Sequence, residues 1–215
     1  MMNEKLIACI QSERIVPLFR KKSQAFISAL LPVLAQTGFH TVEITMESSE
    51  AVASINAIKR NDPSFFVGAG TVKTVADVDR ALDAGADFIV TPIIDEAVIA
   101  YINEKNVPFI PGAYSPSEIF HAYRQGAAFV KVFPGSTLGP DFIRNLRGPL
   151  SEIPLMVTGG ITLENCAAFL DAGAAAVGVG SSLIPKQAVQ ANDWDAARRS
   201  LEAWKRAAHA TVKNK

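Results

Sequence analysis

The sequence predicts an α/β fold, a (β/α)8 or TIM barrel with an additional N-terminal helix. One observation is a repeated unit, in which an amphipathic stretch ends in Gly and a short apolar run follows, as in LAQTGFHTVEIT, ALDAGADFIVTP, AYRQGAAFVKVFP and FLDAGAAAVGVG. A second observation is that the hydrophobic period changes from helical to strand-like after each such Gly. Strands that alternate with helices pair in parallel through right-handed crossovers, and eight units favour closure into a barrel. The alternative is an open, doubly wound sheet.

The eight strands are expected near residues 15–19, 41–45, 65–68, 88–91, 108–111, 129–133, 155–158 and 176–179. Helix ends with a left-handed backbone are expected at Gly38, Gly85, Gly126 and Gly173, and also at Asn61 and Asn106. A last helix is expected from about residue 193 to residue 210. The N-terminal segment, with its apolar face, is expected to close the bottom of the barrel through Leu6, Ile7 and Ile10.

Length and composition favour one domain over residues 1–215 that acts on a small molecule. The 21 basic residues equal the 21 acidic ones, so no nucleic-acid partner is expected. Charges, Pro or Gly interrupt every apolar run, and the first residues carry no signal-peptide pattern, so a cytoplasmic protein without membrane contact is expected. Cys9 and Cys166 form no disulfide framework. The three His residues show no metal-ligand spacing, so neither a metal nor another cofactor is expected.

Lys131 is the first candidate for chemistry because it lies within the apolar strand AFVKVFP. Strand alternation places Phe129, Lys131 and Phe133 on one face, which faces either the barrel interior or the helices. In a dry interior the charged form of lysine is disfavoured, and the free amine is a nucleophile. The alternative is a lysine at the end of a strand whose ammonium reaches solvent.

Glu43 is the second candidate, because it shares one face of the strand TVEIT with two threonines. A carboxylate on an inward face near an amine can transfer protons during catalysis. The alternative is a buried ion pair with Lys131 that only orients the strands, although such pairs seldom add stability.

Two glycine-rich turns follow the seventh and eighth strands. Thr158-Gly159-Gly160-Ile161 and Gly178-Val179-Gly180-Ser181-Ser182 are each expected to open a helix. Backbone N–H groups in such turns bind anions, and many barrels bind phosphate after strands seven and eight. The alternative is a pair of ordinary turns between strand and helix.

The loop Gly68-Ala69-Gly70-Thr71 follows the third strand. Thr71 could donate a hydrogen bond to a carboxylate, or it could only cap the next helix. Thr91-Pro92 and Pro111-Gly112 end strands four and five and are interpreted as turns that shape the rim.

Together these residues resemble the 2-keto-3-deoxy-6-phosphogluconate (KDPG) aldolase family, with its 6-phosphogalactonate and 4-hydroxy-2-oxoglutarate aldolase members. The matching segments occur in the family's order over nearly the whole chain: VEIT, GAGTV, IVTP, PFIPG, KVFPGS, TGGI and VGVGSSL. The resemblance implies a homotrimer of barrels and a metal-free class I mechanism, which releases pyruvate and glyceraldehyde 3-phosphate, or pyruvate and glyoxylate. The stretch LGPDFIRNL resembles the phosphogalactonate type more closely.

The resemblance also implies a role for each matching residue. Lys131 would form the Schiff base, and Glu43 would be the general acid and base. Pyruvate would contact Thr71 and Pro92, and Phe133 would pack on the carbon chain. The distal phosphate would be held by Gly159, Gly160, Gly180 and Ser181.

One position departs from the family pattern. Many members carry Arg four residues after the catalytic glutamate, where this chain has Glu47. Arg20, at the end of the first strand, is expected to bind substrate instead, with Glu47 facing solvent or holding Arg20. Two other functions remain open: a phosphate-binding isomerase, epimerase or decarboxylase that uses Lys131 electrostatically, and a non-catalytic barrel that binds a sugar phosphate.

Overall fold

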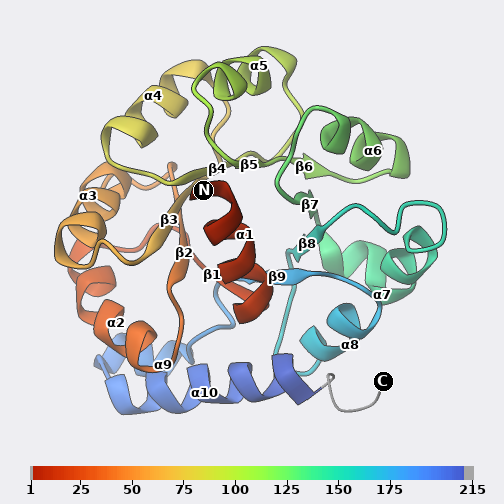
Figure 1. Cartoon of the computed structure of the whole chain (residues 1–215). Helices are drawn as coiled ribbons and strands as arrows, with labels where there is room; N and C mark the ends of the chain where they lie inside the picture. The colour runs from red at the N-terminus through yellow and green to blue at the C-terminus, as the bar shows by residue number, and fades with distance from the viewer. Residues whose placement is uncertain (1, 211–215) are drawn as a thin grey trace.

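A closed barrel of parallel strands surrounded by helices forms the structure (Figure 1). The computed structural model describes residues 2–210. The strands are β1 (Ile15–Phe19), β2 (Thr41–Thr45), β3 (Phe66–Gly70), β4 (Phe88–Val90), β5 (Phe109–Ile110), β6 (Gly112–Ala113), β7 (Val130–Val132), β8 (Leu155–Thr158) and β9 (Ala176–Val179). They pair in the order β5-β4-β3-β2-β1-β9-β8-β7-β6. The eight predicted strand positions are therefore confirmed to within a few residues.

The fifth predicted strand is divided into β5 and β6 by Pro111. Proline has no N–H to donate, so the ladder is interrupted at this residue. β5 pairs with β4 and β6 pairs with β7, while the Pro111 carbonyl accepts the Lys131 N–H at 2.9 Å. The two ends of the pairing order are thus joined through one residue, and the open doubly wound sheet is excluded.

Helices alternate with the strands and cover the outside of the barrel (Figure 1). They are α1 (Met2–Glu13), α2 (Gln24–Gln36), α3 (Ala51–Asn61), α4 (Val75–Asp83), α5 (Glu96–Glu104), α6 (Pro116–Arg124), α7 (Gly135–Leu146), α8 (Cys166–Asp171), α9 (Lys186–Ala191) and α10 (Trp194–Ala210). Local sequence fixes several starts, because side chains cap the first turn at Ser23, Thr74, Asp95 and Ser115. None of the helices in this part of the chain is both long and apolar enough to cross a membrane.

The predicted left-handed helix ends are confirmed with one exception. Gly38, Gly85, Gly126, Gly173 and Asn106 all have positive φ. The prediction for Asn61 is wrong, because α3 ends there and the chain leaves through Asp62 in an extended conformation, with φ −146°.

Two apolar cores follow from strand alternation. One lies between the barrel and its helices and includes Val42, Val130 and Val132. The other fills the lower barrel and includes Phe129, together with Leu6 and Ile10 of α1. Helix α1 therefore closes the amino-terminal end of the barrel, as predicted, and in Figure 1 it lies across the centre of the ring.

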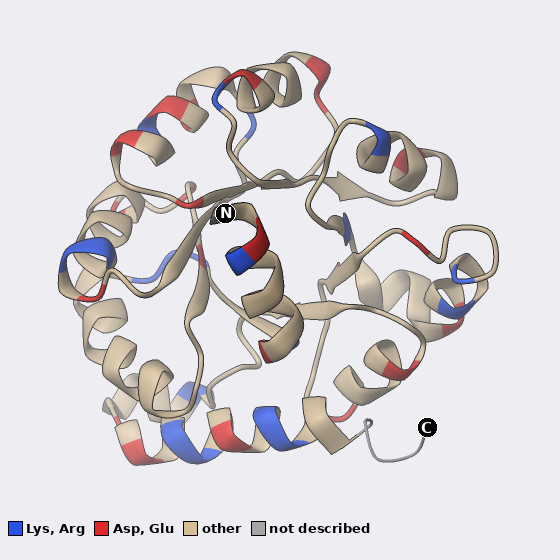
Figure 2. Ribbon diagram, viewed as in Figure 1, with Lys and Arg blue, Asp and Glu red and all other residues tan. Residues whose placement is uncertain are grey.

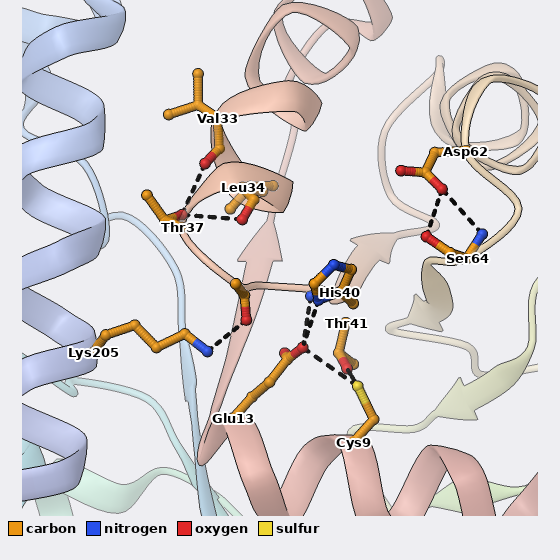
Figure 3. Close-up of polar contacts among 11 residues, drawn as sticks. Cys9, Glu13, Val33, Leu34, Thr37, His40, Thr41, Asp62, Ser64 and Lys205 are labelled. Atoms are coloured by element: carbon orange, nitrogen blue, oxygen red, sulfur yellow. Dashed lines mark hydrogen bonds and ion pairs between the residues drawn. The ribbon is translucent and has the colours of Figure 1, made fainter.

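A buried carboxylate fixes the end of α1 (Figure 3). Glu13 Oε1 accepts the backbone N–H of His40 at 2.6 Å and a hydrogen bond from Cys9 Sγ at 3.3 Å. Lys205 of α10 lies nearby and donates to the Gly38 carbonyl at 2.6 Å. Burial raises the pKa of Glu13, although the His40 N–H and the charge of Lys205 act against that rise.

We predict that Glu13→Gln stabilises the protein at neutral pH. The raised pKa means that the folded state favours the protonated carboxyl, so ionisation of Glu13 lowers stability as pH rises above 4.5. The difference in unfolding free energy between variant and wild type should be small near pH 4 and grow to a plateau at higher pH. Urea unfolding from pH 4 to 8 measures it, with exposed Glu104→Gln as the control. A variant that is less stable at pH 7 would show that ionic contacts outweigh burial.

Candidate active site

A cavity of about 830 Å³ opens at the carboxyl ends of β7, β8, β9 and β1. Seven residues predicted for the site line it: Arg20, Lys131, Phe133, Gly159, Gly160, Gly180 and Ser181. Glu43, Thr71 and Pro92 are outside this lining and come from β2 and from the loops after β3 and β4. The predicted residues therefore form one group along the cavity and a second group beside it.

Lys131 faces the inside of the barrel. Its neighbours Val130 and Val132 belong to the core under the helices, while Phe129 belongs to the core inside the barrel. Lys131 is 6% exposed, and among residues 2–210 its ammonium has no hydrogen bond or ion pair. The ammonium lies 5.4 Å from the centroid of the Phe133 ring, which is itself partly exposed. The alternative of a lysine that reaches outward between helices is thus wrong.

Glu43 also faces inward and is 1% exposed. Neither carboxyl oxygen has a hydrogen-bond partner among the described residues. Burial raises the pKa of this carboxyl, and the charges of Lys131 and Arg20 act in the opposite direction. A carboxyl group with a raised pKa can hold a proton near neutral pH and release it during a reaction.

Lys131 and Glu43 come from opposite sides of the barrel. In the pairing order β2 and β7 are separated by β1, β9 and β8 on one side and by β3, β4 and the β5–β6 strand on the other. Their charges interact, but no ion pair within 4.0 Å joins them in the described structure. The alternative of an ion pair that only orients the strands is therefore wrong.

Glycines in the barrel interior make room for these side chains. A Cβ added to Gly70 would lie 1.9 Å from Glu43 Oε1. A Cβ on Gly112 would lie 2.2 Å from the Pro92 carbonyl oxygen, and Gly112 pairs in register with Lys131. Gly70 and Gly112 thus allow Glu43 and the loop at Pro92 to approach the barrel axis.

The glycine turn after β8 has a conformation that favours glycine. Gly159 and Gly160 have φ values of 89° and 71°, and a Cβ on Gly160 would lie 2.4 Å from Ser136 Oγ. Ser182 Oγ donates to the Ile161 carbonyl at 2.6 Å, which ties this turn to the turn after β9.

The expectation that each glycine turn opens a helix directly is wrong. Helix α8 begins at Cys166 and α9 at Lys186, several residues beyond the glycines. Asn165 uses its side chain to hold the intervening loop, by accepting from the Thr162 N–H at 2.8 Å. Any anion at these turns would therefore meet loop N–H groups rather than the start of α8 or α9.

Thr71 has a left-handed backbone, with φ 57°. This conformation is rare and strained for a β-branched residue, and such strain is concentrated at functional sites. Thr74, rather than Thr71, caps α4 by accepting from the Asp77 N–H, so the capping alternative for Thr71 is wrong.

Arg20 and Glu47 form an ion pair, with 3.3 Å between Nη1 and Oε2. Arg20 lines the cavity whereas Glu47 lies outside its lining. The ion pair confirms the expected contact between Glu47 and Arg20.

Several cavity residues were not identified from the sequence. Thr158 has a buried hydroxyl without a partner in the described structure, and it shares the inward face of β8 with Met156. Lys21, Lys22 and Lys186 also line the cavity. The basic run directly after the first predicted strand was a usable signal for Lys21 and Lys22, because barrel sites lie where strands end.

Comparisons with known proteins agree with this geometry. The family model for KDPG and KHG aldolase matches residues 6–200. The 2-dehydro-3-deoxy-phosphogluconate aldolase of Haemophilus influenzae is 33% identical over 193 residues, which is 89% of this chain and 91% of that protein. The 2-dehydro-3-deoxy-6-phosphogalactonate aldolase of Escherichia coli K12 is 38% identical over 148 residues, or 68% of this chain and 72% of that protein.

A solved structure shares the fold and holds a ligand. It is a KDPG aldolase from Legionella pneumophila, with pyruvate captured at low pH as a covalent carbinolamine intermediate. Its TM-score is 0.84 at 25% identity, covering 92% of this chain and 96% of that chain. With the family model and the two relatives, this likeness shows that the chain belongs to the KDPG and KHG aldolase family and is an aldolase, a carbon–carbon lyase.

Proposed function

We propose that this aldolase cleaves a 2-keto-3-deoxy-6-phospho sugar acid to pyruvate and glyceraldehyde 3-phosphate, with Lys131 as the Schiff-base nucleophile. The observation that carries the proposal is a buried, unpaired lysine that faces a buried, unpaired carboxyl group across the barrel. The Legionella pneumophila structure supports it, because pyruvate there forms a covalent carbinolamine.

The proposed reaction starts with attack of the neutral Lys131 amine on the C2 ketone. Loss of water from the carbinolamine gives an iminium ion, into which electrons flow when the C3–C4 bond breaks. The C4 hydroxyl loses its proton as the aldehyde forms, and the product is an enamine of pyruvate. Protonation of that enamine at C3 and hydrolysis then release pyruvate and the free lysine.

Glu43 is the proposed proton carrier in these steps. Its raised pKa suits a group that must be protonated for water loss and ionised to take the C4 proton. No other described residue holds either carboxyl oxygen, so either oxygen can exchange protons with a bound substrate or with a water molecule that accompanies it.

The remaining predicted residues are proposed to bind the substrate. Arg20 would pair with the carboxylate, since a guanidinium binds carboxylates through paired hydrogen bonds. Thr71 and Pro92 would line the pyruvate end. Phe133, whose ring is already beside the Lys131 ammonium, would pack on the carbon chain.

The distal phosphate is proposed to bind the turns after β8 and β9. Gly159, Gly160, Gly180 and Ser181 line the cavity together, and their backbone and hydroxyl groups can donate to an anion.

The preferred substrate within the class is a second question. One reported relative acts on the gluconate type and the other on the galactonate type, so both phosphorylated acids are candidates. The family description also names KHG, which makes cleavage of 4-hydroxy-2-oxoglutarate to pyruvate and glyoxylate a second candidate activity. A homotrimer and a cytoplasmic location stay predictions, as does one functional domain over residues 1–215.

The experiment that tests the proposal is borohydride reduction in the presence of pyruvate. Reduction should leave a permanent three-carbon adduct on Lys131, which peptide mass spectrometry can locate. Lys131→Ala should lose both the adduct and cleavage while circular dichroism stays unchanged, because no other group supplies the covalent intermediate. Turnover by Lys131→Ala within about tenfold of wild type would rule out the Schiff base.

We also predict that Gly70→Ala slows cleavage by about 10²-fold or more, the range expected when general acid and base catalysis is lost. The new methyl group would displace the Glu43 carboxyl, whose oxygen lies 1.9 Å from the added Cβ position. Gly148→Ala is the matched control, since its nearest atom would be 3.8 Å away. Steady-state rates that are equal in the two variants would remove Glu43 from the mechanism.

Thr71→Gly should raise stability and lower activity. Glycine adopts the left-handed conformation without strain, which we expect to stabilise the fold by about 1 kcal/mol. Loss of the hydroxyl should weaken substrate binding and raise KM. Urea unfolding and steady-state kinetics on the same samples test both effects, and a variant that is more stable and fully active would show that Thr71 has no role in binding.

A further inference from the structure

The charge distribution of the cavity differs from that of the whole protein. The chain has a formal net charge of zero, and its charged residues lie mainly on the outer helices (Figure 2). The cavity lining nevertheless contains five basic side chains and no acidic one: Arg20, Lys21, Lys22, Lys131 and Lys186. Two of these, Lys131 and Arg20, already have proposed roles, whereas the other three have none.

Three of the cavity lysines form no ion pair with a described carboxylate, unlike many basic residues elsewhere: Lys21, Lys22 and Lys186. Within residues 2–210 no carboxylate lies within 4.0 Å of their ammonium groups, and the Lys22 ammonium is 5.3 Å from the Phe26 ring centroid. On the outer helices, Lys59 and Arg80 are each paired with an aspartate. Lys21 and Lys22 also line a neighbouring pocket that contains Glu47 and Glu50, but neither lysine forms an ion pair there. The three cavity lysines therefore keep their positive charges available to a ligand.

Lys21 also has a left-handed backbone, with φ 51°. A residue with a Cβ is strained in this conformation by roughly 1 kcal/mol, which glycine would avoid. Lysine at this position is therefore not explained by local stability, and its side chain lines the cavity.

The three lysines lie near the glycine turns. Lys21 and Lys22 are in the loop between β1 and α2, and Lys186 is the first residue of α9, after β9. β1 pairs with β9, and a Cβ added to Gly180 would lie 3.7 Å from Leu18 of β1. The lysines thus lie on the side of the cavity where the distal phosphate is proposed to bind, away from Thr71 and Pro92.

We propose that Lys21, Lys22 and Lys186 form a cationic rim that recognises the phosphate end of the substrate and makes the enzyme prefer phosphorylated sugar acids. The proposal rests on the proposed aldolase reaction and deepens it. Lysine is a point charge that binds phosphate without fixed geometry, and a cleft lined by one sign of charge raises the association rate of an oppositely charged ligand. The rim therefore acts on capture of the substrate rather than on bond cleavage.

The test compares wild type with a triple variant that carries Lys21→Gly, Lys22→Gln and Lys186→Gln. Glycine at position 21 removes the charge and also relieves backbone strain, so lost activity there cannot be attributed to a strained fold. The matched control neutralises three exposed basic residues at the carboxyl-terminal ends of α3, α5 and α6: Arg60→Gln, Lys105→Gln and Arg124→Gln. The substrates are 2-keto-3-deoxy-6-phosphogluconate and the same acid without phosphate, each at low and high salt.

The rim variant should lose about tenfold or more in kcat/KM for the phosphorylated acid, and that loss should shrink at high salt. Its kcat/KM for the unphosphorylated acid and its kcat should change by less than about twofold. Equal losses on both acids, or an equal loss in the control, would overturn the proposal.

Two further measurements separate the rim from the proposed reaction. Calorimetry with inorganic phosphate should show weaker binding to the rim variant than to wild type, whether or not the enzyme is an aldolase of this substrate. Borohydride trapping of pyruvate should require the same pyruvate concentration in both proteins, because the rim does not contact the pyruvate end. Unchanged phosphate binding would refute the rim, whereas absence of a pyruvate adduct in wild type would refute the Schiff base alone.

Discussion

The structure depends on one constraint: an amine and a carboxyl group must both remain inside a barrel without touching each other. A direct ion pair would compensate the two charges and fill the space that a substrate needs. Lys131 on β7 and Glu43 on β2 come from opposite sides of the closed ring, and no ion pair within 4.0 Å joins them among the described residues. Gly70 lets the carboxyl group lie deep in the barrel, because any side chain at that position would overlap it. Neither oxygen of Glu43 has a hydrogen-bond partner among the described residues, which supports the proposed role of Glu43 as a proton carrier.

The same constraint explains why the two ends of the barrel differ. The lower half is filled by apolar side chains such as Phe129, and α1 closes it with Leu6 and Ile10. This apolar packing closes the barrel below Lys131 and Glu43. The cavity opens at the other end, at the carboxyl ends of the strands. The buried Glu13 accepts the His40 N–H and so ties the end of α1 to the start of β2 (Figure 3).

Much of this arrangement could be predicted from the sequence, because it depends on patterns that are local. Strand alternation showed which residues share a face with Lys131 and with Glu43, although it left open whether the Lys131 face points inward. Four glycines before strands marked helix ends. Features that depend on tertiary contacts could not be predicted. Pro111, which interrupts the ladder, is visible in the sequence, but the neighbour with which each half of the strand pairs is not. The delayed starts of α8 and α9 follow from loop hydrogen bonds such as that between Thr162 and Asn165. No local pattern reveals that Lys186 shares a cavity with Lys21, since 164 positions separate them along the chain.

Glu47 shows how a departure from a family pattern can be accommodated by charge. A free carboxylate in the cavity would repel a substrate that carries both a carboxylate and a phosphate. Glu47 instead pairs with Arg20 and lies outside the lining of the cavity. Arg20 still lowers the pKa of Glu43 against the effect of burial, so its charge is felt inside the barrel although it is paired outside. Pairing with Glu47 reduces the charge that Arg20 offers to a substrate carboxylate. The unpaired Lys21, Lys22 and Lys186 are proposed to act at the phosphate end, so they add to the role of Arg20 and do not replace it.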